Sequence, residues 1–62
     1  MIEYITQVHG VNCLQVHYKS GVNRWLYLGD RYYKMTKTQE NFMNNAEVTE
    51  TETATYWKKK TA

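Results

Sequence analysis

The sequence contains no proline, a single cysteine and only three glycines among its 62 residues. The lone cysteine, Cys13, excludes a disulfide within the chain. The glycines lie too far apart for the GxGxxG or Walker phosphate-binding motifs. No apolar run approaches the roughly 20 residues of a membrane span, and no segment has the pattern of a signal peptide. We therefore expect an intracellular, cytoplasmic protein without a membrane partner.

The chain is short, weakly charged and rich in aromatic residues. We expect residues 1–62 to form a single small domain. A domain of this size buries only about 60% of the surface that its unfolded chain exposes. Two Trp, six Tyr and one Phe supply bulk for such a thin core. The net charge of +2 is too small to imply a nucleic-acid partner by itself. However, acid and base are segregated near the end of the chain, since Glu47, Glu50 and Glu52 precede Lys58, Lys59 and Lys60.

Three glycine-led turns predict a meander of four antiparallel strands. Each of the tetrapeptides at 9–12 and 20–23 has a Gly-Val pair between alternating apolar and polar residues, which is typical of a β-hairpin with a two-residue type II′ turn. A third pair, Gly29-Asp30, returns the chain into residues 31–35. This register places Ile5 opposite Val16 and Tyr18 opposite Trp25.

Alternation along these strands sorts the side chains onto two faces. The predicted core face carries Ile5, Leu14, Val16, Tyr18, Trp25, Tyr27 and Tyr32. The opposite, mixed face carries Tyr4, Thr6, Val8, Cys13, Gln15, His17, Lys19, Arg24, Leu26, Leu28, Arg31, Tyr33 and Met35. A slip of one residue exchanges the two faces, and the sequence alone does not forbid it.

The second half of the chain predicts one helix and one more strand. Thr36 and Gln39 form a Thr-x-x-Gln capping box, so a short helix should span residues 37–45 and pack through Phe42. Residues 47–57 are rich in Thr and lack Gly and Pro, which favours one long strand. That strand should pair beside the first, giving the order 5-1-2-3-4 and a small α+β fold with a C-terminal edge strand. Residues 58–62 should form a flexible basic tail.

The sequence offers two weak candidates for reactive chemistry. His9, Cys13 and His17 have a spacing of four, which on a helix would align ligands for zinc. Strand-like alternation separates these residues instead, and no fourth ligand accompanies them. A thiol nucleophile at Cys13 would need an activated thiolate and a substrate cleft, which a small sheet rarely provides. We therefore predict no enzymatic activity, no cofactor and no metal site.

Cations interleaved with rings give the stronger surface signal. Arg24-Trp25, residues 31–34 and residues 56–60 all place a basic residue beside an aromatic one. Such pairs occur on sheets that bind single-stranded nucleic acid, although no RNP-type motif is present. Aromatic and Arg anchors are equally typical of protein interfaces. We expect a protein partner first, single-stranded nucleic acid as the alternative, and homodimerisation through the edge strand as a further option. The predicted partner-binding residues are Tyr4, His17, Arg24, Leu26, Arg31, Tyr33, Trp57, Lys58, Lys59 and Lys60.

The size and composition of the sequence resemble those of one functional class of proteins. Its small size, lack of proline and richness in Asn, Thr, Tyr and Lys are similar to accessory proteins of phages and other mobile elements. Some of these proteins block host defence machinery by binding to it. The resemblance implies an inhibitor or modulator of a larger protein or nucleoprotein machine.

Overall fold

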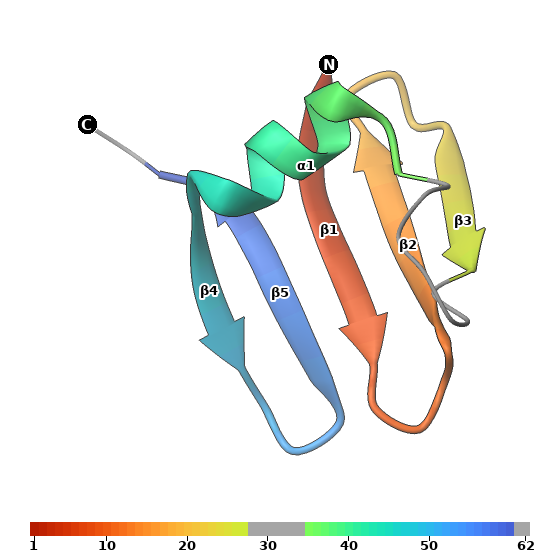
Figure 1. Ribbon diagram of the computed structural model, residues 1–62. Helices are drawn as coiled ribbons and strands as arrows, with labels where there is room; N and C mark the ends of the chain where they lie inside the picture. Colours follow the sequence, from red (N-terminus) through yellow and green to blue (C-terminus); the bar gives the residue numbers. More distant parts are fainter. Residues whose placement is uncertain (28–34, 61–62) are drawn as a thin grey trace.

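One antiparallel sheet of five strands and one helix make up the described part of the chain (Figure 1). The structure is a computed structural model that describes residues 1–27 and 35–60. Its strands lie in the order β3-β2-β1-β5-β4. This small α+β fold confirms the predicted fold class. The elements are β1 (Ile2–Val8), β2 (Cys13–Tyr18), β3 (Asn23–Tyr27), α1 (Lys37–Asn44), β4 (Ala46–Glu50) and β5 (Ala54–Lys59).

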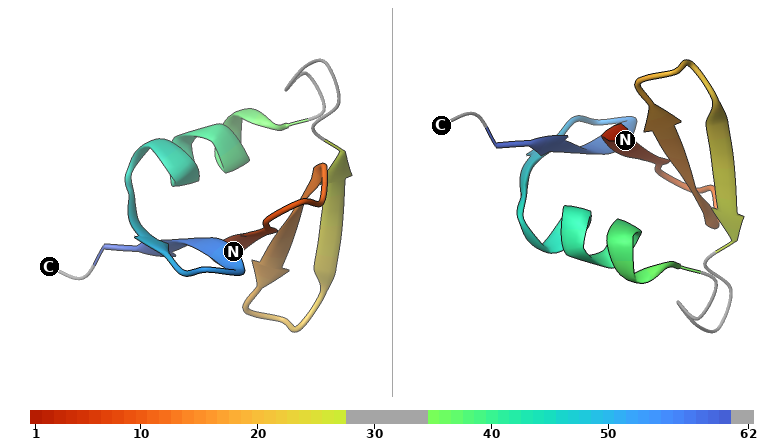
Figure 2. Two further views of the ribbon diagram at one scale, coloured as in Figure 1. Left: turned by 90° about the horizontal axis from the view of Figure 1, so that it is seen from below. Right: turned by 90° about the horizontal axis from the view of Figure 1, so that it is seen from above.

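The helix covers only one side of the sheet, as the edge-on views of Figure 2 show. We call this side the helix face and the opposite side the open face. The fully buried core lies on the helix face and consists of Ile2, Ile5, Leu14 and Val16. Half-buried side chains surround it, namely Tyr18, Leu26, Met35, Phe42, Met43 and Trp57. No helix among the described residues is long and apolar enough to cross a membrane.

The helix begins at the predicted capping box. The Thr36 Oγ1 accepts a hydrogen bond from the Gln39 amide at 3.2 Å, and the Gln39 Oε1 accepts one from the Thr36 amide at 2.9 Å. These two bonds satisfy backbone donors that a helix start leaves unpaired. The buried Gln39 also donates from Nε2 to the Tyr18 hydroxyl at 3.1 Å. The cap therefore both starts α1 and ties it to β2, while Phe42 packs against the core as predicted.

The first hairpin has the predicted pairing but a different turn. Ile5 lies opposite Val16, as the sequence indicates. The Val11 amide donates to the Val8 carbonyl at 3.1 Å, so the tight turn spans residues 8–11. Gly10 has a φ of 87° and is the second central residue of this turn, the position at which type II turns need a positive φ. The loop is thus longer than two residues, yet the faces of β1 and β2 are unchanged.

The second hairpin corrects the predicted register of β3. The Gly21 amide donates to the Tyr18 carbonyl at 2.9 Å, and the Tyr18 amide donates to the Val22 carbonyl at 3.2 Å. Gly21, with a φ of 87°, thus closes a three-residue loop of the kind that combines a type I turn with a bulge. Trp25 consequently pairs with Gln15 and not with Tyr18. The difference of three residues is odd, so every side chain of β3 takes the face opposite to the predicted one.

The C-terminal segment forms a hairpin, so the prediction of one long strand at residues 47–57 is wrong. The Thr51 hydroxyl donates to the Ala54 carbonyl at 2.8 Å and accepts from the Ala54 amide at 3.0 Å, which reverses the chain without glycine or proline. β5 then pairs antiparallel with β1, as predicted for the last strand. Lys58 and Lys59 belong to β5 and so extend it into the segment predicted as a tail. The predicted order 5-1-2-3-4 with a C-terminal edge strand is corrected, because β5 lies between β1 and β4. Among the described strands, the two edges of the sheet are β4 and β3.

The predicted fourth strand of the meander falls mostly outside the described residues. Its turn at Gly29-Asp30 and the core assignment of Tyr32 lie outside them as well. Met35, the last residue of that predicted strand, forms a bend immediately before the helix cap.

We predict that Thr51→Val destabilises the fold because it removes both side-chain hydrogen bonds of the turn while keeping the side-chain shape. The expected loss is about 1–2 kcal/mol of unfolding free energy. Chemical denaturation followed by circular dichroism measures it. Thr49→Val is the matched control, since Thr49 is exposed on the same hairpin and should leave the midpoint unchanged. Equal midpoints for the two variants would contradict this role of Thr51.

Candidate functional site

The open face carries aromatic side chains on four successive strands. The register places Trp25 on β3, His17 on β2, Tyr4 on β1 and Tyr56 on β5 on the side away from the helix. Tyr27 shares this face, because it lies two residues after Trp25. Neighbouring strands are about 4.8 Å apart, so rings on successive strands are close enough for one partner to touch several.

Two of these rings at the centre of the face are in direct contact. The rings of Tyr4 and His17 stack with centroids 4.0 Å apart and an angle of 12° between their planes. Tyr56 lies on the other side of Tyr4 at 6.5 Å, tilted by 44°. Stacked and tilted rings at these distances attract each other beyond their simple burial of area. The centre of the open face is therefore held in a fixed arrangement.

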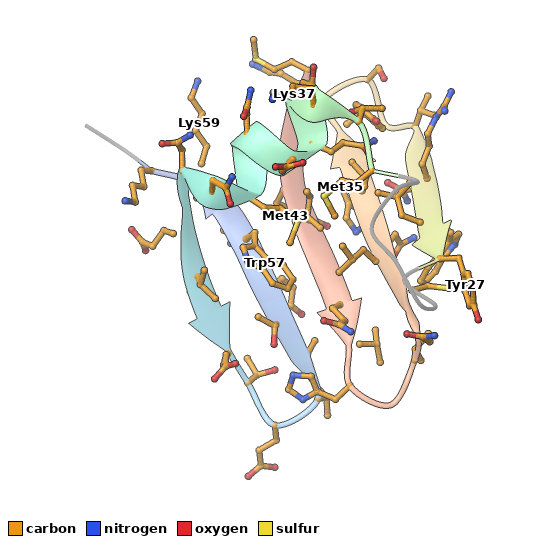
Figure 3. All side chains as sticks on the ribbon, in the orientation of Figure 1. Tyr27, Met35, Lys37, Met43, Trp57 and Lys59 are labelled. Atoms are coloured by element: carbon orange, nitrogen blue, oxygen red, sulfur yellow. The ribbon has the colours of Figure 1, made fainter. Side chains whose placement is uncertain are left out.

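The rings at the β3 side of the face are largely exposed. Trp25 is 56% exposed and Tyr27 is 59% exposed, although both are large apolar groups. Figure 3 shows Tyr27 projecting from the end of β3. Their strand neighbour Leu26 packs instead against the core on the helix face. Since side chains alternate along a strand, burying Leu26 forces the two rings outward.

Two polar atoms of this region are buried without a hydrogen-bond partner. They are Oγ1 of Thr6 and Nε2 of His17, and both residues belong to strands that carry the ring pair. A buried polar atom that makes no hydrogen bond costs stability. Both atoms therefore lack a hydrogen-bond partner within the described chain.

A shallow hollow lies at the β5 side of the open face. It has a volume of about 410 Å³ and is lined by Glu3, Tyr4, Tyr56, Lys58 and Lys59. Glu47 lies opposite Lys58 on the neighbouring strand, so both signs of charge occur here. Two rings with mixed charges at the border have the composition of a small recognition pocket.

The helix side holds a larger hollow of about 590 Å³ between α1 and the sheet. Its walls are mainly Leu14, Met35, Met43 and Trp57, which also pack against the core. Glu40 is the only ionisable group among the described residues that line it. Figure 3 shows Met35, Met43 and Trp57 gathered beneath the helix, where they fill space as core residues.

The structure separates the residues predicted to bind a partner. Tyr4, His17 and Lys58 lie on the open face, as expected for the first two. Arg24 and Leu26 lie on the helix face, because the register of β3 differs from the predicted one. Trp57 is half-buried beside the core, Lys59 lies opposite Ala46, and Lys60 is exposed after β5. Arg31 and Tyr33 are outside the described residues.

Sequence reasoning missed three rings of the open face. The predicted register puts Trp25 and Tyr27 on the core face, and the predicted last strand, which holds Tyr56, has no clear inner side. The type of turn at Gly21 is the signal that decides the face of β3, but a Gly-Val pair permits several turns. The rings are therefore found only once the cross-strand pairs are known.

The histidines and the cysteine serve different structural roles. The His9 Nε2 lies 2.8 Å from the Thr55 Oγ1 and its Nδ1 lies 3.2 Å from the Glu52 carbonyl, so this ring links the two hairpin ends. Cys13 is half-buried on β2, and His17 stacks on Tyr4. Within residues 1–27 and 35–60, no three His, Cys, Asp or Glu side chains come together as metal ligands do.

Comparison of the chain with protein-family models, with curated proteins and with solved structures finds no match. The function therefore has to be argued from the open face itself.

Proposed function

We propose that the protein is a non-enzymatic interaction protein that binds a protein partner on the open face and thereby modulates or inhibits a larger protein or nucleoprotein machine. One observation carries the proposal: Trp25 and Tyr27 are more than half exposed on a sheet face that no helix of the described chain covers. Exposing such rings to water forgoes the free energy of burying them. Trp and Tyr are also the residues that most often dominate binding energy at protein interfaces.

The charge of this face favours a protein over single-stranded nucleic acid. Nucleic-acid binding depends strongly on cations that neutralise phosphates. Among the described strand residues of the open face, Lys58 is a cation, and it lies opposite Glu47. The rings could stack on bases, but the face offers little positive charge to hold the backbone. A mixed, weakly charged surface with aromatic anchors suits a protein partner better.

The shape of the sheet supports the modulating role. A five-stranded sheet with one aromatic face can cover a surface on a larger molecule. This agrees with the resemblance of the sequence to accessory proteins of mobile elements, which act by occupying a surface of their target.

The proposal is tested by changing neighbouring residues of β3 that point to opposite faces. Tagged wild-type protein captures its partner from a lysate of the source cells, and calorimetry measures the affinity for the purified partner. We expect Trp25→Ala and Tyr27→Ala each to cost about 1–3 kcal/mol of binding free energy with an unchanged melting temperature. Arg24→Ala is the matched control on the other face and should bind normally. Equal losses for Arg24→Ala and Trp25→Ala would contradict the proposal.

A second arm tests the nucleic-acid alternative. A labelled mixed-sequence single-stranded oligonucleotide is titrated with the wild-type protein at low salt. We expect no binding at micromolar protein concentration. Two results together would overturn the protein-partner proposal in favour of this alternative. The first is binding whose affinity falls steeply as the salt concentration rises, and the second is a smaller salt dependence after Ala replaces Lys58, Lys59 and Lys60.

A further inference from the structure

The outer strand β4 has a row of backbone groups that the described chain leaves unpaired. The Thr51 amide donates to the Ala54 carbonyl at 2.7 Å, which marks these two residues as a hydrogen-bonded pair. Such pairs alternate with non-hydrogen-bonded ones along an antiparallel ladder. The next hydrogen-bonded pairs are therefore Thr49 with Tyr56 and Glu47 with Lys58. It follows that Ala46, Val48 and Glu50 direct their amides and carbonyls away from β5, to the edge of the sheet.

The side chains along this edge have a directional charge pattern. On the helix face of this edge, Glu50 ends β4 and Glu52 follows in the turn, whereas Glu47 lies near the other end of β4, on the open face opposite Lys58. The basic end of β5 lies at the other end, where Lys59 is opposite Ala46. Figure 3 shows Lys59 beside the start of β4. Between them, Val48 is an apolar residue that is 52% exposed. On the helix face, the edge thus has an acidic group at one end, a basic group at the other and an apolar residue at its centre.

We propose that β4 pairs antiparallel with β4 of a second copy of this chain, with Val48 opposite the partner's Val48. In this register Ala46 lies opposite the partner's Glu50, and Glu50 lies opposite the partner's Ala46. All three residues of the unpaired row then face the same three residues of the copy, and each facing pair exchanges two backbone hydrogen bonds. A shift to either side would leave some of these groups unpaired.

The charges match in the same register. The side chains of Ala46 and Lys59 are neighbours across β4 and β5. Ala46 is small, so the long Lys59 side chain can reach over it to the partner's Glu50, and two-fold symmetry repeats this contact. Lys60 is exposed and directly follows β5. Glu47 lies opposite the partner's Thr49, so no carboxylate faces another directly.

The charges on β4 fit pairing with a second copy better than they fit a role in preventing the edge strand from pairing with other chains. Charged residues on an edge strand normally discourage pairing with other chains. Here the acidic residues would repel most strands, yet they meet neutral or basic groups in one antiparallel register. The pattern therefore selects a second copy over an arbitrary strand.

The dimer has a consequence for the open face, although the pairing does not depend on the proposed function. A two-fold axis perpendicular to the sheet joins the two five-stranded sheets edge to edge. Both open faces then lie on the same side of one continuous sheet. A partner with two matching sites could bind both copies at once.

Sedimentation equilibrium of the full chain, from micromolar to millimolar concentration, tests the pairing. We expect a reversible rise in mass from 7.4 kDa to twice that value. Val48→Lys should raise the dissociation constant by about tenfold or more, because it removes the apolar centre and adds two like charges. Val22→Lys is the matched control, since Val22 is 55% exposed but lies away from β4. A chain that stays monomeric throughout, or equal effects of the two variants, would overturn the proposal.

A charge exchange tests the register independently of folding. Glu50→Lys and Lys59→Glu should each weaken the dimer, because each places like charges together. The double variant carrying both changes should recover the wild-type dissociation constant to within about threefold. Failure of the double variant to recover, with native circular dichroism, would show that Lys59 and the partner's Glu50 do not meet.

Discussion

Ile5→Ala is expected to lower the free energy of unfolding by about 2–5 kcal/mol, a loss that includes the cavity left behind by the missing atoms. Ile5 is 0% exposed and belongs to the central strand β1, where it lies between Val16 on β2 and Trp57 on β5. Typical domains are stable by only about 5–15 kcal/mol, and a small one with a thin core is near the lower limit. A loss near the upper end of this range would leave a large part of the population unfolded at physiological temperature.

Urea denaturation followed by circular dichroism measures this effect. Val22→Ala is the control, because it also removes methyl groups from a β-branched residue, but at an exposed position outside the core. We expect its midpoint to lie close to that of the wild type. If Ile5→Ala unfolded at the same urea concentration as Val22→Ala, the core would not lie between the helix and the central strands.

The two tryptophans are expected to respond in opposite ways to replacement by alanine. Trp57 is half-buried on the helix face and packs against the core, so Trp57→Ala should cost about 3 kcal/mol of stability. Trp25 is more than half exposed on the open face, so Trp25→Ala should change stability by no more than about 0.5 kcal/mol. The predicted register of the second hairpin would instead make Trp25 the destabilising position.

Melting temperatures and indole fluorescence of the two variants distinguish these arrangements. In Trp57→Ala the remaining indole is Trp25, which should emit as a solvated ring. In Trp25→Ala the remaining indole is Trp57, which should emit at shorter wavelength because it is partly shielded. A larger loss of stability for Trp25→Ala than for Trp57→Ala would show that β3 has the opposite face buried.

Local signals in the sequence determined much of the architecture. The capping box at Thr36 and Gln39 fixed the start of the helix, because its hydrogen bonds form between residues three apart. The glycines at positions 10 and 21 marked two reversals of the chain, since both residues adopt a positive φ. The pairing of Ile5 with Val16 followed from the first of these turns.

The hairpin at the C-terminus could not be read from composition. A run of Thr, Glu and aromatic residues favours extended backbone throughout. The reversal depends on the side chain of Thr51, which bonds to the backbone of Ala54. Thr forms such turns only weakly, so many similar threonines lie within strands. In this chain the hairpin is stabilised further by His9, which holds Glu52 and Thr55 from the neighbouring loop.

The sequence by itself determined that a capped helix and several amphipathic strands form, because caps, turns and alternation are local properties of a few residues. Only the tertiary structure decided which face of β3 is buried and which strand forms the outer edge. The predicted loop at Gly21 has two residues and the observed loop has three. This difference shifts the register of β3, so Trp25 and Leu26 exchange faces of the sheet. The choice rests on long-range contacts, since Leu26 packs against the core while the helix covers one side only. The aromatic open face and the unpaired edge of β4 are both products of that assembly.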